Sequence, residues 1–237
     1  MSTPRVALVT GATSGLGLAL SGALADAGLA VALTGRSRQD AEAAAEALRQ
    51  RGHQDVAGFA LDVTDPLSVS RAVTETRRRF GTVDALVNNA AVAADPRATA
   101  STVSLEVFEA TLAVNTTGPL RVAQEVLPLM REAGAGRIVN IVSHMASLGA
   151  MTTPTSPAYT VSKTALLAVT RKLAAELEAD GTGITVNAVS PGQVDTRMSY
   201  RPGAQSPQQA AETMLWLLLE EQVPTGGFFH GREPLPW

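Results

Sequence analysis

The feature that most constrains the fold is a regular alternation of strand-like and helix-like segments along the chain. Short apolar runs rich in β-branched residues predict strands, and longer segments with apolar residues at helical spacing follow them. This alternation is typical of βαβ units, in which helices cover both faces of a parallel sheet. Strands are predicted at residues 6–10, 31–34, 56–61, 85–88, 137–142, 184–189 and 227–230, and helices at 18–27, 40–51, 66–80, 104–131, 158–179 and 207–219.

Length and composition favour a single domain. The chain has 237 residues, of which 45% are hydrophobic and 17% charged, as in a globular protein with a sizeable core. No internal repeat, low-complexity linker or shift in composition divides it. We therefore expect one domain over residues 1–237 with a doubly wound α/β fold, a three-layer α/β/α sandwich around a parallel sheet of about seven strands.

The charge and residue content exclude several classes of function. A net charge of −3 and an isoelectric point near 5.7 leave no basic surface for nucleic acid. There are no cysteines, and the three histidines are scattered without the spacing of metal ligands. The N-terminus runs directly into a strand, which leaves no room for a signal peptide, and no apolar run is long enough to cross a membrane. We expect a cytoplasmic enzyme without nucleic-acid or membrane partners.

A glycine-rich turn lies between the first predicted strand and the first predicted helix. Gly11, Gly15 and Gly17 follow the pattern TGxxxGxG, which allows the backbone to approach a ligand closely. The N-terminus of the following helix favours an anion such as a phosphate. Glycines also serve ordinary tight turns, but this position at the start of a βαβ series predicts a dinucleotide site.

The end of the second predicted strand indicates which dinucleotide binds. An acidic residue there would hydrogen-bond the adenosine ribose, whereas a neutral residue followed by arginine suits a 2′-phosphate. Gly35 occupies this place, Arg36 follows it, and Arg38 is close by. A guanidinium can bind a phosphate with two hydrogen bonds, so we predict NADPH (NADP⁺) rather than NADH. The alternative is that Arg36 is an ordinary surface arginine.

A serine, a tyrosine and a lysine mark a candidate reaction site. Ser143 ends the predicted strand 137–142, and Tyr159 and Lys163 begin the predicted helix 158–179. Residues four apart share one face of a helix, so the phenol and the ammonium project together. This arrangement favours proton delivery to a substrate oxygen. The alternative is a chance pairing, in which the lysine is solvated and the serine caps the strand end.

With these residues considered together, the chain resembles the short-chain dehydrogenase/reductase family over nearly its whole length. The matches follow the family's order and spacing, although Ala91 replaces the last glycine of the family's NNAG element. The tail 224–237 resembles a carbonyl-reductase-like subgroup. The matching positions are the loop 10–17, Asp62–Val63, residues 88–91, Asn115, Ser143, Tyr159, Lys163, Pro191–Gly192 and Thr196.

The resemblance implies a Rossmann-type fold, a nicotinamide cofactor and a catalytic tetrad. The tetrad is Asn115, Ser143, Tyr159 and Lys163, with a carbonyl compound as the small-molecule substrate. The predicted cofactor-binding residues are Gly11, Thr13, Ser14, Gly15, Leu16, Gly17, Arg36, Asp62, Val63, Asn89, Ala90, Tyr159, Lys163, Pro191, Gly192, Val194 and Thr196.

Carbonyl reduction sets a demand on the tyrosine. Its ordinary pKa is about 10, so action near pH 7 requires a shift of about three units, or roughly 4 kcal/mol. One positive charge at ~4 Å in an effective dielectric of about 20 supplies that much, so Lys163 is adequate. Ser143 would donate a hydrogen bond to the substrate oxygen. By the resemblance, Asn115 would hold a water that links Lys163 to solvent.

Several neighbouring residues compete for these roles. Ser147 is the rival of Ser143, which we favour because it directly ends the strand. His144 could line the pocket, but strand alternation points it away from its neighbour. The methionines at positions 145, 151 and 198 are expected to pack rather than to recognise a ligand.

The substrate pocket is expected to be open. The segment 195–209 is short and polar, with no apolar helix to form a lid, and the loop 91–102 and the segment 148–158 would form the other walls. Arg97, Arg197 and Arg201 are the cations nearest to these walls in the sequence. The separation of 16 residues between Ser143 and Tyr159 is long for the family, which makes that segment a candidate for substrate choice.

Two other functions and one assembly question stay open. The chain could belong to a biosynthetic pathway and catalyse a reaction that is not net redox, or bind a cofactor as a regulatory protein without turnover. Family members commonly pair through helices after the fourth and fifth strands, which favours a homodimer or homotetramer. The apolar faces of Leu120–Met130 and Ala165–Leu177 permit pairing, but a stripe buried against the sheet explains them equally well.

Overall fold

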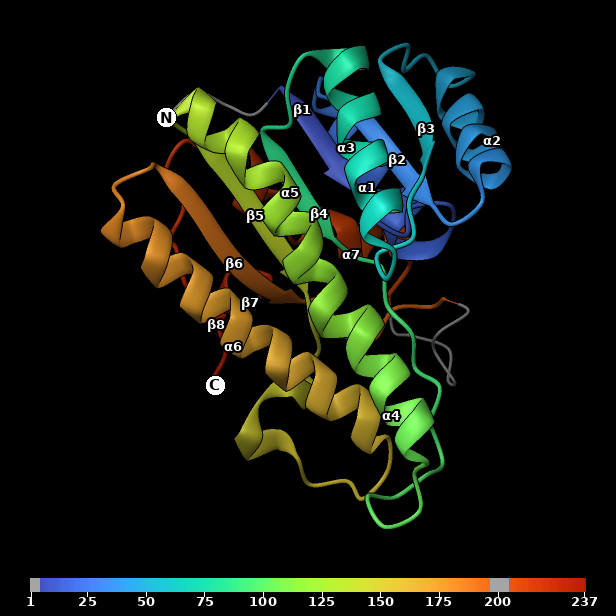
Figure 1. The fold of residues 1–237 in the computed structure, drawn as a ribbon, viewed down its shortest axis with the longest axis vertical. Helices are drawn as coiled ribbons and strands as arrows, with labels where there is room; N and C mark the ends of the chain where they lie inside the picture. The colour runs from blue at the N-terminus through green and yellow to red at the C-terminus, as the bar shows by residue number, and fades with distance from the viewer. Residues whose placement is uncertain (1–4, 197–204) are drawn as a thin grey trace.

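The protein folds around one eight-stranded sheet, seen in a computed structural model that describes residues 5–196 and 205–237 (Figure 1). The strand order is β3-β2-β1-β4-β5-β6-β7-β8, and every neighbouring pair is parallel except β7 and β8. The strands are β1 (Val6–Val9), β2 (Ala30–Gly35), β3 (Val56–Ala60), β4 (Ala85–Asn88), β5 (Gly136–Ile141), β6 (Ile184–Ser190), β7 (Phe228–His230) and β8 (Glu233–Pro234).

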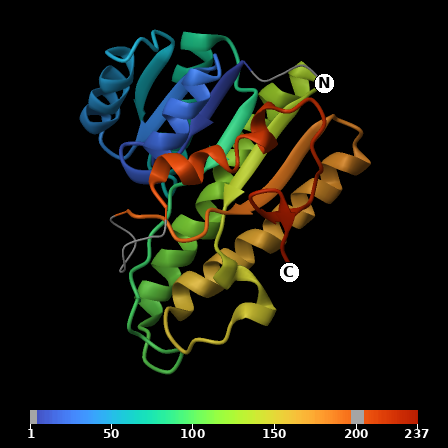
Figure 2. The same cartoon turned by 180° about the vertical axis from the view of Figure 1, so that it is seen from behind.

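Helices cover both faces of the sheet, which gives the three layers that we expected. One apolar cluster joins α1, α2, α7 and α8 to one face, and a second joins α3, α5 and α6 to the other (Figures 1 and 2). No helix in the described part of the chain is long and apolar enough to cross a membrane. The helices are α1 (Gly15–Asp26), α2 (Arg38–Arg49), α3 (Pro66–Phe80), α4 (Leu105–Leu112), α5 (Gly118–Ala133), α6 (Pro157–Ala179), α7 (Pro207–Glu212) and α8 (Trp216–Leu219).

The predicted elements are all present, but a π-helical turn at Ala113–Thr117 divides the predicted helix 104–131 into α4 and α5, and three further details differ. The final strand was predicted at the edge of the sheet, which is wrong because β8 pairs antiparallel outside β7. Helix α1 begins at Gly15, so two of the loop glycines lie in its first turn. The predicted helix 207–219 is two helices, because hydrogen bonds between residues three apart tighten the turns at Met214 and Leu217.

The apolar stripes on α5 and α6 face the protein's own core. Val122, Val126 and Met130 are buried in the cluster beneath α5, and Leu173 and Leu177 of α6 belong to the same cluster. Burial against the sheet therefore accounts for these apolar residues, and pairing between chains is not needed to explain them. They provide no argument for pairing between chains.

The sheet order places its switch point between β1 and β4. Strands β2 and β3 lie on one side of β1, and β4 and the later strands lie on the other side. The loops after β1 and β4 therefore diverge and leave a crevice at the carboxyl ends of these strands.

Buried amides hold the neighbouring strands in place. Asn88 donates to Asn140 Oδ1 at 2.9 Å, and Asn140 donates to Thr170 Oγ1 at 2.9 Å, which ties β4 and β5 to α6.

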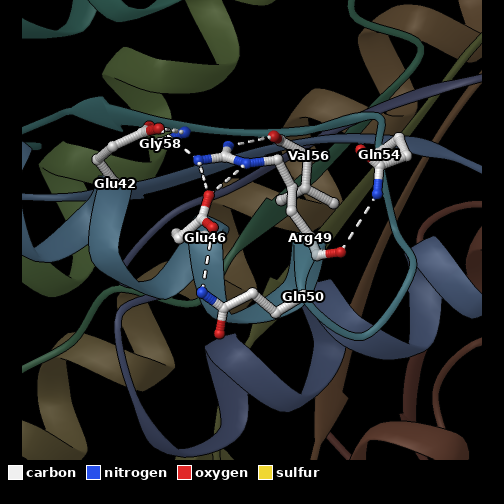
Figure 3. A network of polar contacts seen from close by, with 7 residues as sticks. All are labelled: Glu42, Glu46, Arg49, Gln50, Gln54, Val56 and Gly58. Atoms are coloured by element: carbon white, nitrogen blue, oxygen red, sulfur yellow. Dashed lines mark hydrogen bonds and ion pairs between the residues drawn. The ribbon is translucent and has the colours of Figure 1, made fainter.

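Helix α2 is held against the outer strand β3 by a polar network (Figure 3). Arg49 donates to Val56 O at 2.9 Å and forms ion pairs with Glu42 and Glu46 at 2.6 and 2.8 Å. Glu42 in turn accepts from Gly58 N at 3.1 Å. A Cβ at Gly58 would lie 2.4 Å from the backbone of α2, so only glycine permits this approach. The network fixes the helix that follows Arg36.

Candidate active site

A cleft of about 1050 Å³ crosses the carboxyl ends of the strands. Every residue predicted to bind the cofactor lines it. Of the residues predicted to be catalytic, Ser143, Tyr159 and Lys163 also line it, and Asn115 does not. Residues from six strand ends therefore meet in one cleft, as the carboxyl ends of parallel strands require.

The glycine-rich loop forms one wall of the cleft. Gly11 and Gly15 have φ of 62° and 56°, a region that other residues rarely adopt. A Cβ at Gly17 would lie 2.4 Å from Gly11 O and 2.5 Å from Asn89 Nδ2. The side chain of Ser14, the residue before α1, makes no hydrogen bond to the helix end. The loop thus presents a helix N-terminus without a side chain in front of it, which suits a phosphate.

The residues after β4 brace this loop. Asn89 Nδ2 donates to Thr10 O and Gly11 O, both at 2.9 Å. Thr10 Oγ1 accepts from the backbone N–H groups of Asn89 and Ala90, both at 3.0 Å. Asn89 therefore shapes the glycine-rich loop in addition to lining the cleft.

The end of β2 carries a second hollow of about 440 Å³, lined by Thr13, Arg36, Ser37 and Asp40. Gly35 leaves no room for an acidic side chain, because a Cβ there would lie 2.4 Å from Thr13 Cγ2. Arg36 is exposed beside this hollow, whereas the nearby Arg38 forms an ion pair with Glu75 at 3.0 Å. Of the two arginines, Arg36 is thus the one placed to contact a ligand.

Asp62 and Val63 line the cleft after β3. Hydrogen bonds from the side chain and backbone of Thr64, at 2.7 and 2.9 Å, hold the pKa of Asp62 below its ordinary value. Arg121 donates to Val63 O. Gly118 packs closely against Val63, because a Cβ added at Gly118 would lie 2.7 Å from Val63 Cγ2. These contacts fix the wall expected to face adenine.

Ser143, Tyr159 and Lys163 meet at the other end of the cleft. Lys163 Nζ donates to Ile141 O at 2.8 Å and lies 6.0 Å from the centroid of the Tyr159 ring. Ser143 Oγ accepts from Met145 N at 3.2 Å and so caps the turn after β5, and its hydroxyl also favours a lower pKa for Tyr159. The phenol, the ammonium and the serine hydroxyl therefore face the same space, as the four-residue spacing predicts.

Burial dominates the proton affinities of this group. Burial raises the pKa of Tyr159, and the Ser143 hydroxyl opposes this effect. Burial also lowers the pKa of Lys163 from 10.5 to about 7. We expected Lys163 to bring the tyrosine pKa down, but in the protein alone the pKa of Tyr159 is raised. The reason is that Lys163 is buried and Tyr159 is half-buried at the wall of the cleft, and the loss of solvent around each group disfavours its charged form.

Asn115 lies in a π-helical turn, Ala113–Thr117, between α4 and α5. Its amide accepts from Val92 N and donates to Val92 O, both at 2.8 Å, and donates to Ser162 Oγ at 3.0 Å. Ser162 Oγ donates to Tyr159 O at 2.7 Å. Asn115 is thus completely buried behind the cleft, where it joins the loop after β4 to the turn of α6 that carries the tyrosine.

The rivals of Ser143 point elsewhere. Ser147 donates to Trp237 O at 3.3 Å, and His144 hydrogen-bonds Ser190 Oγ at 2.7 Å and packs against the His230 ring. Burial lowers the pKa of His144, and the neighbouring His230 lowers it further. Neither residue lines the cleft. This confirms the orientation expected of His144 and favours Ser143 over Ser147.

The expected pocket walls need correction. Of the segment 148–158, only Ser156 is among the described residues that line the cleft. The segment begins with a 3₁₀ turn at Leu148–Ala150, and Ser147 before it hydrogen-bonds to Trp237 O. The loop 91–102 contributes Ala91, Val92 and Ala93. Met145 lines the cleft, whereas Met151 and Arg97 do not; Met198, Arg197 and Arg201 lie outside the described residues.

Sequence reasoning missed Asp95, a buried acid in the loop after β4. Its carboxylate accepts from Ala158 N at 2.6 Å and from Tyr159 N at 3.3 Å. The nearest local signal is the Asp–Pro pair, which indicates a turn and not a contact with a helix some sixty residues away. Asp95 therefore reaches the start of α6 only through the tertiary fold.

Comparison with known proteins identifies the class. The short chain dehydrogenase family matches residues 5–206, and the chain belongs to this family of oxidoreductases. D-threitol dehydrogenase from Mycolicibacterium smegmatis is 37% identical over 97% of this chain and 82% of its own length. The putative ketoacyl reductase of the monensin polyketide synthase from Streptomyces virginiae is 36% identical over 96% of this chain and 85% of its own.

Solved structures share the fold. A gluconate 5-dehydrogenase from Burkholderia cenocepacia, in complex with NADP and tartrate, superposes with a TM-score of 0.86. It is 27% identical, and the match covers 95% of this chain and 92% of that one. The doubly wound architecture is thereby confirmed.

Proposed function

We propose that the protein is an NADPH-dependent carbonyl reductase that transfers hydride to a ketone or aldehyde, or oxidises a secondary alcohol in reverse. The observation that carries this proposal is the meeting of Ser143, Tyr159 and Lys163 in the same cleft as the glycine-rich loop. The proton-handling groups and the phosphate-binding turn are then placed to act on one bound pair of molecules.

The residues present fit a dinucleotide. The absence of side chains at Gly11, Gly15 and Gly17 leaves a cradle beside the N-terminus of α1, and the hollow at Arg36 extends it beyond the end of β2. Asp40 lines the same hollow and would oppose an anion, so Arg36 must outweigh it. When bound, the cofactor supplies the hydride.

The chain's own side chains handle the proton and the substrate oxygen. Tyr159 gives its hydroxyl proton to the oxygen during reduction and takes it back during oxidation. Ser143 donates a hydrogen bond to the same oxygen and stabilises the negative charge that develops there. Protonated Lys163 favours the phenolate that Tyr159 becomes, and it holds its own position through Ile141 O. Asn115 fixes the backbone around Tyr159 through Ser162. Its two amide N–H groups are taken up by Val92 O and Ser162 Oγ, so its side chain has no donor left for the proton-relay water that the family resemblance implies.

The relatives support alcohol and ketone chemistry. Their names describe a dehydrogenase of D-threitol and a putative ketoacyl reductase, and the structural neighbour is a gluconate dehydrogenase. These substrates share a secondary alcohol or the corresponding ketone, which is the group that Ser143 and Tyr159 would hold. A non-redox reaction in biosynthesis, or cofactor binding without turnover, would use the same cleft without needing both groups aimed at one oxygen.

The direct test is a substrate panel. The protein is incubated with NADPH and a set of aldehydes and ketones, and with NADP⁺ and a set of secondary alcohols including threitol and gluconate, while absorbance of the reduced cofactor is followed. Turnover of at least one compound supports the proposal. Tight cofactor binding in calorimetry without any turnover would instead favour the regulatory alternative.

Replacing Arg36 by Ala should weaken NADPH selectively. Loss of a charge-assisted contact to the 2′-phosphate, about 1.5–3 kcal/mol, should raise the Michaelis constant for NADPH by about 10- to 100-fold and leave that for NADH within about twofold. Arg38→Ala is the matched control, because Arg38 is paired with Glu75. Steady-state kinetics with both cofactors measure the effect. A wild type that uses NADH equally well, or an Arg36→Ala variant that matches Arg38→Ala, would refute the assignment.

A further inference from the structure

Helix α6 begins without a side-chain cap from the residue that precedes it. Ser156, the residue before it, is in the left-handed conformation with φ of 61° and makes no side-chain bond to the helix end. Pro157 has no N–H group, so the first backbone donors of the helix are Ala158 and Tyr159. Because α6 has 23 residues and a substantial positive potential at this end, these donors need an acceptor.

Asp95 supplies that acceptor from another part of the chain. Its carboxylate accepts from both donors, at 2.6 and 3.3 Å, and only 3% of the residue is exposed. No ion pair joins Asp95 to another residue in the described ranges. The positive end of α6 is therefore the counter-charge for a buried carboxylate, and Tyr159 lies within that end.

The loop around Asp95 is attached to the start of α6 along its length. Ser156 N donates to Ala98 O at 3.1 Å, and Thr99 forms a β-bridge with Thr155. Earlier in the same loop, Val92 is bound by Asn115, which is linked through Ser162 to Tyr159. The backbone of Tyr159 is thus held from two sides by the loop after β4.

We propose that Asp95 is a positioning residue for Tyr159, which it aims through the backbone of α6 and whose proton affinity it sets with its negative charge. This inference rests on the role proposed for Tyr159. The charged group that lies against the Tyr159 ring is Lys163 on the same helix, and Ser143 contributes a hydroxyl from the end of β5. His144 is turned toward Ser190 and His230, and does not take part.

The variant Asp95→Asn separates charge from capping. The amide oxygen keeps an acceptor for one N–H of α6, but the negative charge at the start of the helix that carries Tyr159 is lost. The potential of the helix end then favours the phenolate, so the apparent pKa of Tyr159 should fall by about 0.5–1 unit. Asp95→Ala removes both contributions and should lower kcat about 10- to 100-fold, with the Michaelis constant for NADPH within about twofold.

The matched control is Asp84→Asn. Asp84 also accepts two backbone N–H groups, those of Arg5 and Val6 at 3.0 Å each, but at the opposite end of the sheet. Asp84→Asn can keep one oxygen for both N–H groups and should lose less stability than Asp95→Asn, and only Asp95→Asn should shift the pH dependence of kcat, measured with a compound that the wild type turns over. Equal pH profiles for wild type and Asp95→Asn would overturn the proposal.

A titration independent of turnover completes the test. The chain has two tyrosines, Tyr159 and Tyr200, so a Tyr200→Phe background reports phenolate absorbance from Tyr159 alone. Asp95→Asn in this background should titrate at lower pH than the background itself, while circular dichroism monitors folding. An unchanged titration overturns the proposal. If Tyr159 titrates at lower pH in Asp95→Asn as expected, but the Tyr159→Phe enzyme is active, the catalytic role of the tyrosine is refuted. The inference that Asp95 positions Tyr159 then still holds.

Discussion

Replacing Tyr159 by Phe should lower the rate of carbonyl reduction by about 10²- to 10⁴-fold, the contribution usual for a positioned acid. The variant removes one hydroxyl, that of the tyrosine that lines the cleft with Ser143. Cofactor affinity should stay within about twofold, because the glycine-rich loop and Arg36, which we propose to bind the phosphates, line the other end of the cleft. Single-turnover kinetics with saturating NADPH, together with fluorescence titration of NADPH binding, measure the two effects separately.

Thr160→Val is the matched control for this variant. It also removes a hydroxyl, at the next position of α6, where Thr160 Oγ1 is buried without a partner in the described part of the chain. Thr160 does not line the cleft, so its loss should leave the rate near that of the wild type. Retained turnover by Tyr159→Phe, or an equal loss in both variants, would remove the tyrosine from its role as proton donor.

Local sequence signals predicted the cofactor half of the cleft. A glycine-rich turn between a strand and a helix is confined to a few consecutive residues, and the positive φ of Gly11 and Gly15 follows from it. The same holds for Tyr159 and Lys163, because helical spacing alone brings them to one face. Strand ends such as Ser143 could be placed because parallel strands end at one edge of the sheet.

Contacts across the fold could not be predicted in this way. Asp95 and the start of α6 are far apart in sequence, and their pairing depends on the path of the loop after β4. Asn115 was found as a motif residue, but its burial behind the cleft follows from the π-helical turn that rotates it toward Val92. The direction of the Tyr159 pKa shift also depends on burial, which a pair of residues four apart does not reveal.

Replacing Lys163 by Met should make the protein more stable at neutral pH while it loses most of its activity. Lys163 is completely enclosed, and burial lowers its pKa from 10.5 to about 7. Holding a proton in that site therefore costs about 4–5 kcal/mol at pH 7 and below, at about 1.4 kcal/mol per unit. Methionine has a similar volume without the charge, and the loss of the bond to Ile141 O offsets about 1–3 kcal/mol. The net gain should be about 1–4 kcal/mol.

The pH dependence of stability gives the sharper test. Between about pH 7 and 10.5, unfolded Lys163 holds a proton that the folded protein does not, so the stability of the wild type rises with pH. From pH 7 to 9 this group should add about 2 kcal/mol, and Lys163→Met should lack that increment. The raised pKa of Tyr159 acts in the opposite direction, but only above its ordinary value of 10.0.

Urea unfolding at several pH values measures how the stability of each protein changes with pH. A Met variant that is less stable at pH 7 and keeps the wild-type slope would show that Lys163 is not held at the cost of stability. If the stability of the wild type and that of Lys163→Met change equally with pH, the pKa of Lys163 is not lowered by burial. The argument for its role beside Tyr159 would then be weaker.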